Sequence, residues 1–324
     1  MNIIDLHCDT VLCCYTGKET LRSFHGHISL EKLKAGGCLA QCFALFIPTH
    51  DTAVKYLGQE EDPWMVYQQL LQTYRDIISD SGEMIRPALS ADQVVENRQR
   101  GLMSSVLTIE DAVELDGKLE RLDTVYGDGV RMIALTWNYE NCVGFPNSSD
   151  LNEHLHHGLK PFGFALVERM NELGIIIDVS HLSEAGFYDV ASHSKKPFIA
   201  SHSCCRALKN HPRNLTDAQL RAVADAGGVI GVNFYDEFLG DLSGYTATED
   251  ILRHLLHMRN QAGIESLAFG SDFDGIESRL EFRDYSGFPM ILGAMEQYFT
   301  DDEIDKITHK NFLRVFADQN GVSV

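Results

Sequence analysis

Short apolar runs recur along the chain, and longer stretches with helical periodicity separate them. There are eight such runs of four to eight residues, and most are dominated by Val, Ile, Leu, Ala and Phe, without alternating polar residues. Uninterrupted apolar runs of this length are typical of strands buried on both faces of a parallel sheet. The pattern predicts strands at 2–6, 39–46, 105–109, 130–136, 175–179, 197–200, 229–234 and 267–270.

The stretches between these runs carry apolar residues at helical spacing. Some have clear boundaries, since Thr216-Asp217 is a helix-start signal and Gly227-Gly228 ends the same stretch before the next run. We predict helices at 64–79, 91–100, 115–126, 162–173, 184–192, 217–226 and 249–262, and a terminal helix at 301–317.

Alternation of strands and helices from end to end predicts the α/β class. Eight strands with intervening helices fit a (β/α)8 TIM barrel, and 324 residues allow a few insertions. Because no Pro-, Gly- or Ser-rich linker divides the chain, we predict a single barrel domain over residues 1–324. The polar stretch 141–158 is then a long loop over the barrel mouth. A doubly wound open sheet is the alternative.

Composition narrows the partners. The chain is 44% hydrophobic and 23% charged, which is ordinary for a globular protein. A formal net charge of −20 argues against nucleic acid and against anionic membranes. No apolar stretch approaches the roughly 20 residues that span a bilayer, and no secretion signal opens the chain. We therefore expect a cytoplasmic protein, without a membrane partner, whose eight cysteines are reduced.

Potential metal ligands lie at the ends of the apolar runs. His7 and Asp9 follow the first run two residues apart, so in extended backbone both point the same way. Glu110, His181 and His202 each end a later run. Because the carboxyl ends of barrel strands meet at one face, we expect these side chains to converge there. Each has a structural alternative when taken alone, such as a hydrogen-bonded strand-end histidine or a helix N-terminal acid at Glu110.

Five ligands exceed what one catalytic zinc with an open position needs. Two ions fit better, with Glu110 as the bridge between a His7/Asp9 metal and a His181/His202 metal. The imidazole-rich set suits zinc, while manganese, cobalt and iron remain open. Asp272 follows the last run and closes the circle beside His7. A carboxylate there can take a proton from metal-bound water.

Six segments together resemble one known family in order along the chain. They are Asp-x-His-x-Asp-Thr at 5–10, Thr-Ile-Glu at 108–110, Asp-Val-Ser-His at 178–181, Ala-Ser-His-Ser at 200–203, Pro-Arg-Asn-Leu at 212–215 and Gly-Ser-Asp-Phe-Asp-Gly at 270–275. This series resembles the membrane (renal) dipeptidase family of zinc metallopeptidases in the amidohydrolase superfamily, in a microbial, cytoplasmic form.

The resemblance implies a (β/α)8 barrel, two zinc ions per chain and dipeptide substrates, with a D-residue tolerated at the C-terminal position. It makes Arg213 the group that grips the substrate's C-terminal carboxylate, Asp272 the proton-handling carboxylate, and the following residues the metal ligands: His7, Asp9, Glu110, His181 and His202. A guanidinium fork suits a carboxylate independently of the family.

One departure from the mammalian enzymes leaves substrate choice open. Where the mammalian enzymes have a substrate-contacting histidine, this chain has Trp137 and Asn138, so one of these takes over that contact or it is absent. We expect Asn233-Phe234-Tyr235, at the end of another run, to form part of the pocket wall.

Two rival functions remain. The first is another binuclear hydrolase of the superfamily, a deaminase or lactonase, although these typically carry His-x-His where this chain has His7-Cys8-Asp9. The second is an inactive metal-binding barrel. A homodimer is left open.

Overall fold

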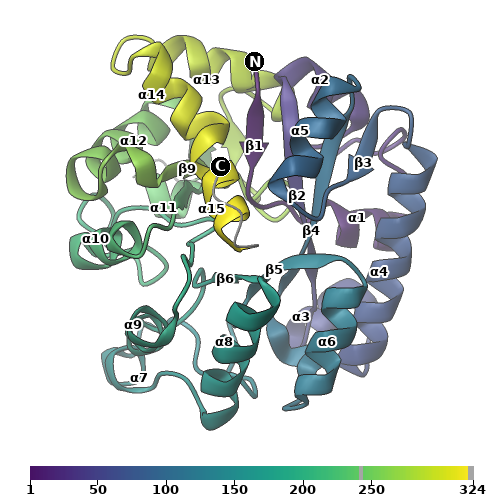
Figure 1. Ribbon diagram of the computed structural model, residues 1–324, viewed down its shortest axis with the longest axis vertical. Helices are drawn as coiled ribbons and strands as arrows, with labels where there is room; N and C mark the ends of the chain where they lie inside the picture. The colour runs from purple at the N-terminus through teal and green to yellow at the C-terminus, as the bar shows by residue number, and fades with distance from the viewer. Residues whose placement is uncertain (241–243, 320–324) are drawn as a thin grey trace.

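The computed structural model describes residues 1–240 and 244–319 and has an α/β fold (Figure 1). Parallel strands form a central sheet in the order β6-β5-β4-β2-β1-β9-β7, and a short strand, β3, pairs with β4. The strands of this sheet are β1 (Ile3–Asp5), β2 (Cys38–Phe46), β3 (Ile85–Pro87), β4 (Met103–Glu110), β5 (Val130–Ala134), β6 (Ile176–Asp178), β7 (Ile230–Val232) and β9 (Leu267–Phe269). The predicted α/β class with a parallel sheet is confirmed.

The sheet is curled, and residues 199–200 lie between its two end strands. Asp178 of β6 bridges to Ile199, and Ala200 bridges to Ile230 of β7, both in parallel orientation. The strand predicted at 197–200 is thus reduced to two isolated bridges. This link between β6 and β7 favours a closed barrel over the open sheet.

Helices surround the sheet in Figure 1, and most lie where the sequence predicts them. The larger ones are α1 (Thr10–Gly17), α2 (Leu30–Gly36), α3 (His50–Leu57), α4 (Pro63–Asp80), α5 (Ala91–Gln99), α6 (Leu119–Gly127), α8 (Pro161–Leu173), α9 (Glu184–His193), α10 (Asp217–Asp225), α12 (Thr248–Ala262), α13 (Phe288–Met295) and α15 (Asn311–Gln319). The shorter ones are η1 (Ala112–Leu115), α7 (Leu151–His156), α11 (Asp236–Leu239), η2 (Ile264–Ser266), η3 (Tyr285–Gly287), α14 (Asp301–Asp305) and η4 (Lys306–Lys310), and β8 (Tyr245–Thr246) pairs with β10 (Arg279–Leu280).

Three predicted segments differ in detail. The helix predicted at 115–126 is split, because Asp116 and Gly117 have φ of 50° and 70° and end η1 before α6 begins. The predicted loop 141–158 contains the short helix α7. The predicted terminal helix continues from α14 through a π-helical turn, η4, into α15.

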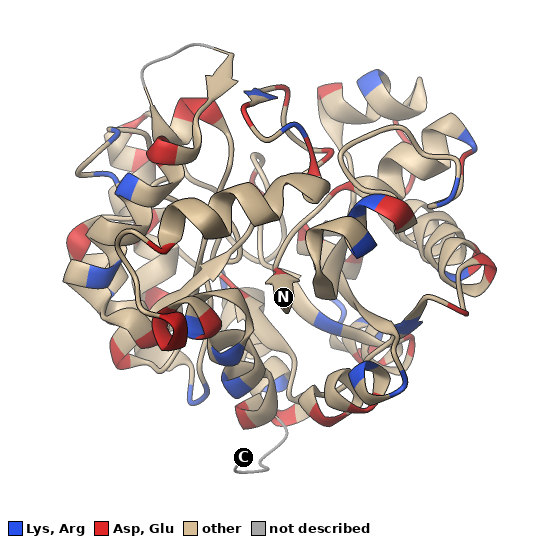
Figure 2. Cartoon of the chain, turned by 90° about the horizontal axis from the view of Figure 1, so that it is seen from above, with Lys and Arg blue, Asp and Glu red and all other residues tan. Residues whose placement is uncertain are grey.

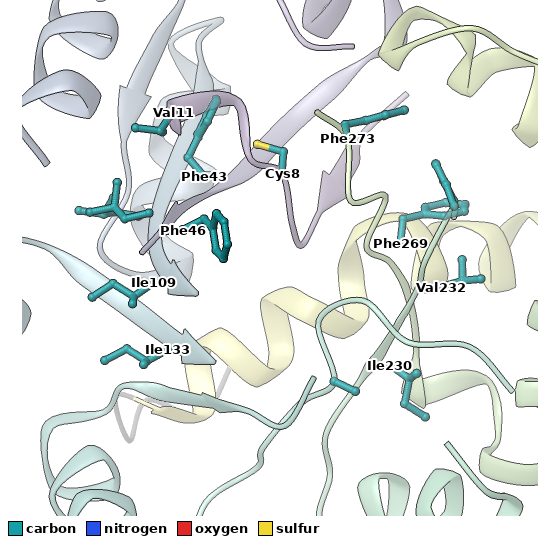
Figure 3. Packing of buried hydrophobic residues seen from close by; sticks show 14 of the residues in the cluster. Cys8, Val11, Phe43, Phe46, Ile109, Ile133, Ile230, Val232, Phe269 and Phe273 are labelled. Carbon is teal, nitrogen blue, oxygen red and sulfur yellow. The ribbon is translucent and has the colours of Figure 1, made fainter. Parts of the chain in front are cut away.

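Two apolar layers hold the sheet. Inside the curl, side chains such as Ile4, Val106 and Ile176 form one cluster, and Phe312 and Phe316 of α15 pack into it. Outside the curl, alternate strand residues such as Phe43, Ile109 and Val232 pack against the helices (Figure 3), as the two-residue period of a strand requires. α15 lies near the centre of the view in Figure 1. Through Phe312 and Phe316 it covers the end of the curled sheet that is opposite the carboxyl ends of the strands.

The outer surface is charged. Figure 2 shows Lys, Arg, Asp and Glu residues mixed over the peripheral helices. In the full sequence, Asp and Glu outnumber Lys and Arg by 47 to 27. Among the helices of residues 1–240 and 244–319, none is both long and apolar enough to cross a bilayer.

Candidate metal centre

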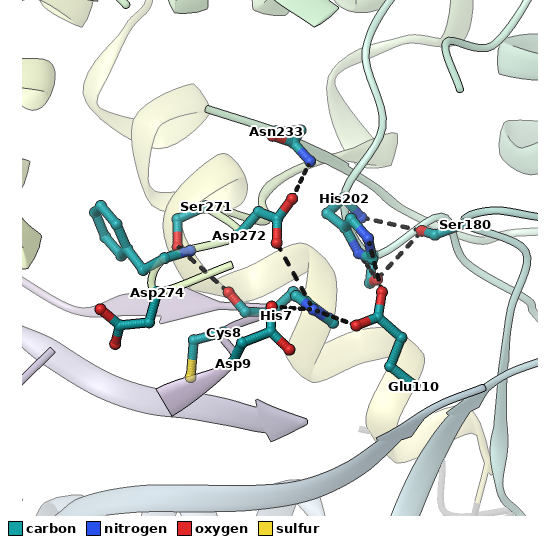
Figure 4. A network of polar contacts seen from close by, with 12 residues as sticks. His7, Cys8, Asp9, Glu110, Ser180, His202, Asn233, Ser271, Asp272 and Asp274 are labelled. Carbon is teal, nitrogen blue, oxygen red and sulfur yellow. Dashed lines mark hydrogen bonds and ion pairs between the residues drawn. The ribbon is translucent and has the colours of Figure 1, made fainter. Parts of the chain in front are cut away.

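The carboxyl ends of the central strands bring six predicted site residues together. His7 and Asp9 follow β1, Glu110 is the last residue of β4, and His181 follows β6. Two others come from neighbouring strand ends, His202 after residues 199–200 and Asp272 after β9. Figure 4 shows His7, Asp9, Glu110, His202 and Asp272 pointing toward one another. His7, Glu110 and His202 are 0–3% exposed, so the group is buried.

One half of the group surrounds His7. Its Nε2 atom lies 3.5 Å from Asp9 Oδ2, 3.4 Å from Glu110 Oε2 and 3.9 Å from Asp272 Oδ1. His7 Nε2 and Asp9 Oδ1 are buried without a hydrogen-bond partner among the described residues. Buried polar atoms are nearly always paired, so two unpaired atoms here are atoms that can coordinate a metal ion.

The other half surrounds the second oxygen of Glu110. Oε1 lies 3.0 Å from His181 Nε2 and 3.4 Å from His202 Nε2, and these two nitrogens are 3.0 Å apart. The two oxygens of Glu110 therefore face different histidines, Oε2 toward His7 and Oε1 toward His181 and His202.

Hydrogen bonds at the far side of each ring set the tautomers in this second half. His181 Nδ1 lies 3.0 Å from Asn138 Oδ1, an acceptor, so Nδ1 carries the proton. The Ser201 hydroxyl donates to Asp178 and lies 2.6 Å from His202 Nδ1, so it accepts the Nδ1 proton. Both Nε2 atoms then present lone pairs to Glu110 Oε1. Three lone-pair atoms facing one another are repulsive unless a cation lies between them, which is the donor arrangement of a metal site.

Burial and neighbouring charges lower the pKa values of His181 and His202, whereas the pKa of His7 is raised. Burial, and then the positive charges of Arg213 and His7, lower the pKa of His181 well below its usual value. Burial, His7 and Arg213 do the same to the pKa of His202, so both rings are neutral, the form that binds metals. Burial opposes a charge on His7, but the carboxylates of Glu110 and Asp9 raise its pKa well above the usual value. Burial raises the pKa of Glu110 to about 7, against the charge of His7.

Backbone geometry at the strand ends is constrained. His181 and Asp272 have positive φ angles of 69° and 63°, a region that non-glycine residues seldom occupy and that clusters at functional sites. At Gly270, a Cβ atom would lie 1.7 Å from the carbonyl oxygen of Ser201. Glycine therefore lets the end of β9 approach the 199–200 segment, which brings Asp272 close to the histidines.

A cavity of about 350 Å³ opens onto this group. Its lining includes Asp9, Glu110, His181, Arg213 and Asp272, together with Asn138 and Tyr235. The three residues predicted to contact substrate, Arg213, Asn138 and Tyr235, thus line one cavity with the candidate ligands. Asn138 also holds His181, a contact that the sequence did not predict.

Arg213 is held in place by its neighbours along the chain. Its side chain is buried, donates from Nη2 to the carbonyl of His202 at 3.2 Å, and keeps Nε without a hydrogen-bond partner among the described residues. The guanidinium of Arg206 donates to the carbonyls of Pro212 and Asn214 at 3.1 and 2.9 Å. One arginine therefore fixes the turn that presents the other to the cavity.

The sequence model of the membrane dipeptidase family, peptidase family M19, matches residues 1–323. The chain belongs to the membrane dipeptidase family. The family prediction is confirmed, and with it the prediction that the chain is a metallodipeptidase. Dipeptides are the substrates of this family, and a metal is its cofactor.

Relatives in the family span most of the chain. An uncharacterized protein in the pqqA 5′ region of Klebsiella pneumoniae is 38% identical over 264 residues, which are 78% of this chain and 96% of that protein. An uncharacterized dipeptidase of Schizosaccharomyces pombe is 32% identical over 90% of this chain and 71% of its own length. A solved metallopeptidase of Rhodobacter sphaeroides, liganded with a phosphinate mimic of the dipeptide L-Ala-D-Ala, is 25% identical with a TM-score of 0.91, covering 98% of this chain and 99% of that chain.

Other contacts within this dipeptidase-family site were not predicted. Asp178 and Ser201 hold His202, and Asn233 donates from Nδ2 to Asp272 Oδ2 at 2.9 Å. Asp178 and Ser201 stand within three residues of a predicted ligand histidine, and this proximity is the signal that could have marked them. Asn233 was predicted only as part of the pocket wall. Its contact with Asp272 had no such signal, because the two residues lie 39 positions apart in the chain.

Proposed function

We propose that this protein is a zinc-dependent dipeptidase with a binuclear centre in a single (β/α)8 barrel over residues 1–324. The observation that carries the proposal is that the two carboxylate oxygens of Glu110 face different histidines. Oε2 faces His7, and Oε1 faces His181 and His202. The family match over residues 1–323 and the link of β6 to β7 support the single barrel.

His7 and Asp9 would hold one ion, His181 and His202 the other, and Glu110 both. The imidazole and carboxylate donors fit zinc. A pair of such ions, when bound, supplies hydroxide at neutral pH and polarises the substrate carbonyl. This set uses each strand-end residue that the sequence predicts as a ligand.

Asp272 would be the residue that handles the proton. Its Oδ1 lies 3.9 Å from His7 Nε2, so it borders the ligands, while the amide of Asn233 holds Oδ2. Burial raises the pKa of Asp272, while His7 and Asn233 act in the opposite direction. A carboxylate with a raised pKa accepts a proton more readily and returns it to the leaving amine.

Arg213 would bind the free C-terminal carboxylate of the dipeptide, and Tyr235 would border it. The unpartnered Nε of Arg213 and its place in the cavity wall support this role. We extend the proposal to L-Xaa-D-Xaa dipeptides, because the Rhodobacter sphaeroides relative carries an L-Ala-D-Ala mimic. The cytoplasmic location stays a prediction, and a homodimer stays open.

Chelation and reconstitution test the function. Purified protein should hydrolyse L-Ala-L-Ala and L-Ala-D-Ala, lose activity after dialysis against a chelator and recover it with added zinc. Glu110→Gln should abolish recovery, and Glu96→Gln, an exposed change on α5, should not affect it. Full activity in the metal-free protein, or in Glu110→Gln, would contradict the proposal.

A further inference from the structure

Three aromatic side chains form one wall of the cavity. We define this aromatic wall as Phe46, Tyr56 and Trp137, all of which line the cavity. The ring centroids of Phe46 and Trp137 are 4.9 Å apart, and those of Phe46 and Tyr56 are 6.2 Å apart in an edge-on arrangement. These spacings are those of favourable aromatic pairs, so the wall is a packed unit.

The wall stands on the opposite side of the cavity from Arg213. Its residues come from the end of β2, from α3 and from the segment after β5, and β4 with Glu110 runs between β2 and β5. Arg213 lies 5.4 Å from the ring of Phe238, which packs on Tyr235, and these residues follow 199–200 and β7. In the strand order, these two groups are on opposite sides of the candidate ligands.

Lys55 lies beside the aromatic wall, and its ammonium group already has partners. Lys55 Nζ lies 3.8 Å from Glu277 and 5.0 Å from the ring centre of Tyr56. Its side chain is 60% exposed, so an ion pair there contributes little. The aromatic wall itself carries no charge, and the ring centroids of Trp137 and His181 are 6.1 Å apart.

We propose that the aromatic wall is the subsite for the N-terminal side chain of the dipeptide and that it selects aromatic or large aliphatic residues there. The inference rests on the proposed function. When Arg213 grips the C-terminal carboxylate and the scissile carbonyl lies at the ligands, the N-terminal residue extends toward the opposite side. Burial of its apolar side chain against the wall then adds binding free energy in proportion to the area removed from water.

Two dipeptide series test the subsite with zinc-loaded protein. In the series Xaa-Ala, with Xaa as Ala, Leu or Phe, kcat/KM should rise at least about tenfold from Ala to Phe, as a well-filled apolar pocket allows. In the series Ala-Xaa the same substitution should have a smaller effect. Trp137→Ala should reduce the ratio of kcat/KM for Phe-Ala to kcat/KM for Ala-Ala at least about fivefold. It should leave the ratio of kcat/KM for Ala-Phe to kcat/KM for Ala-Ala unchanged.

Two further variants keep the test independent of folding. Tyr56→Ala removes a ring that is 39% exposed and should lower the same ratio. Tyr298→Ala removes a similarly exposed ring just after α13 and should leave it unchanged. Metal content is measured for each variant.

The failures are separable. Absence of hydrolysis of any dipeptide overturns the proposed function. Hydrolysis without a preference for Phe-Ala, or a preference that Trp137→Ala and Tyr56→Ala both leave intact, overturns the subsite alone.

Discussion

Replacing Ser201 by Ala removes the hydroxyl that joins His202 to Asp178. This hydroxyl donates to Asp178 Oδ2 and accepts the Nδ1 proton of His202, which keeps the lone pair on Nε2. Without it, the Nδ1–H group of His202 loses its acceptor, and the tautomer that points a lone pair at Glu110 is no longer fixed. We expect weaker zinc binding together with lower stability of the metal-free protein.

The size of the effect follows from the hydrogen bonds that the substitution removes. These join the Ser201 hydroxyl to Asp178, to His202 and, at 3.2 Å, to the Ser180 hydroxyl. A hydrogen bond to a charged group is worth about 1.5–3 kcal/mol, and a buried donor left without an acceptor costs about 1–3 kcal/mol. Since these hydrogen bonds share one oxygen atom and are not additive, we expect the free energy of unfolding to fall by about 2–5 kcal/mol. Loss of a partner that orients a ligand histidine typically weakens metal binding about 10–100-fold.

Ser271 provides a matched control. It precedes Asp272 as Ser201 precedes His202, and its hydroxyl donates to Asp5 Oδ2 at 2.6 Å, a buried carboxylate at the end of β1. The other hydrogen bonds of this hydroxyl among the described residues are to backbone atoms of His7 and Phe273, so the hydroxyl orients no imidazole ring. Ser271→Ala should therefore destabilise the fold by a similar mechanism and change zinc affinity much less.

Competition with a chromophoric zinc chelator measures affinity, and urea unfolding of the metal-free proteins measures stability. If Ser201→Ala binds zinc as tightly as the wild type, or if Ser271→Ala weakens binding equally, the tautomer argument is refuted.

Three further predictions use the same structure. Asp272→Asn should keep most metal and lower kcat about 10²–10⁴-fold, the usual worth of general acid–base catalysis; parallel loss of metal and activity, measured on one preparation, would make it a ligand instead. Arg213→Met should lower kcat/KM at least about tenfold, and C-terminal amidation of the substrate should cause the same loss in the wild type. The substitution and the amidation together should cause no larger loss than either alone, because both remove one interaction. Equal cleavage of amidated and free dipeptides by the wild type would refute the role of Arg213 in binding the carboxylate. Glu114 is fully buried with both carboxyl oxygens unpartnered among the described residues, and burial raises its pKa well above the usual value. At a pH above the usual pKa of a glutamate and below the raised pKa of Glu114, the native state keeps a proton that the unfolded chain releases. The free energy of unfolding therefore falls as pH rises through this range, by up to about 1.4 kcal/mol per pH unit. Urea titrations between about pH 5 and 8 should show a smaller loss in Glu114→Gln than in the wild type, and parallel profiles would contradict this.

Buried parallel strands are predictable from sequence because both of their faces are apolar. Runs such as 39–46 and 105–109 have no polar period to confuse with a helix, and both lie in observed strands, β2 and β4. The segment 197–200 is different, because it pairs only through single bridges that depend on where β6 and β7 lie. The break at Asp116-Gly117 had a local signal, the Asp-Gly turn pair, that the helical period outweighed.

The candidate ligands were predictable because strand ends meet at one face, so residue type and position were enough for His7, Glu110 and His202. The orientation of each ring was not predictable. It depends on contacts such as Asn138 with His181, across 43 residues, and these exist only after the strands have assembled. The side chains that make up the aromatic wall come from three separate segments, so the wall was not predictable for the same reason.

The central claim is that Glu110 lies between two metal ions. Anomalous scattering from crystals of the zinc-loaded protein, collected on both sides of the zinc absorption edge, tests it directly. The account predicts two zinc peaks about 3.5–4 Å apart, one beside His7 and Asp9 and one beside His181 and His202, each within bonding distance of a different oxygen of Glu110. A single peak at saturating zinc, or two peaks that share no contact with Glu110, would contradict it.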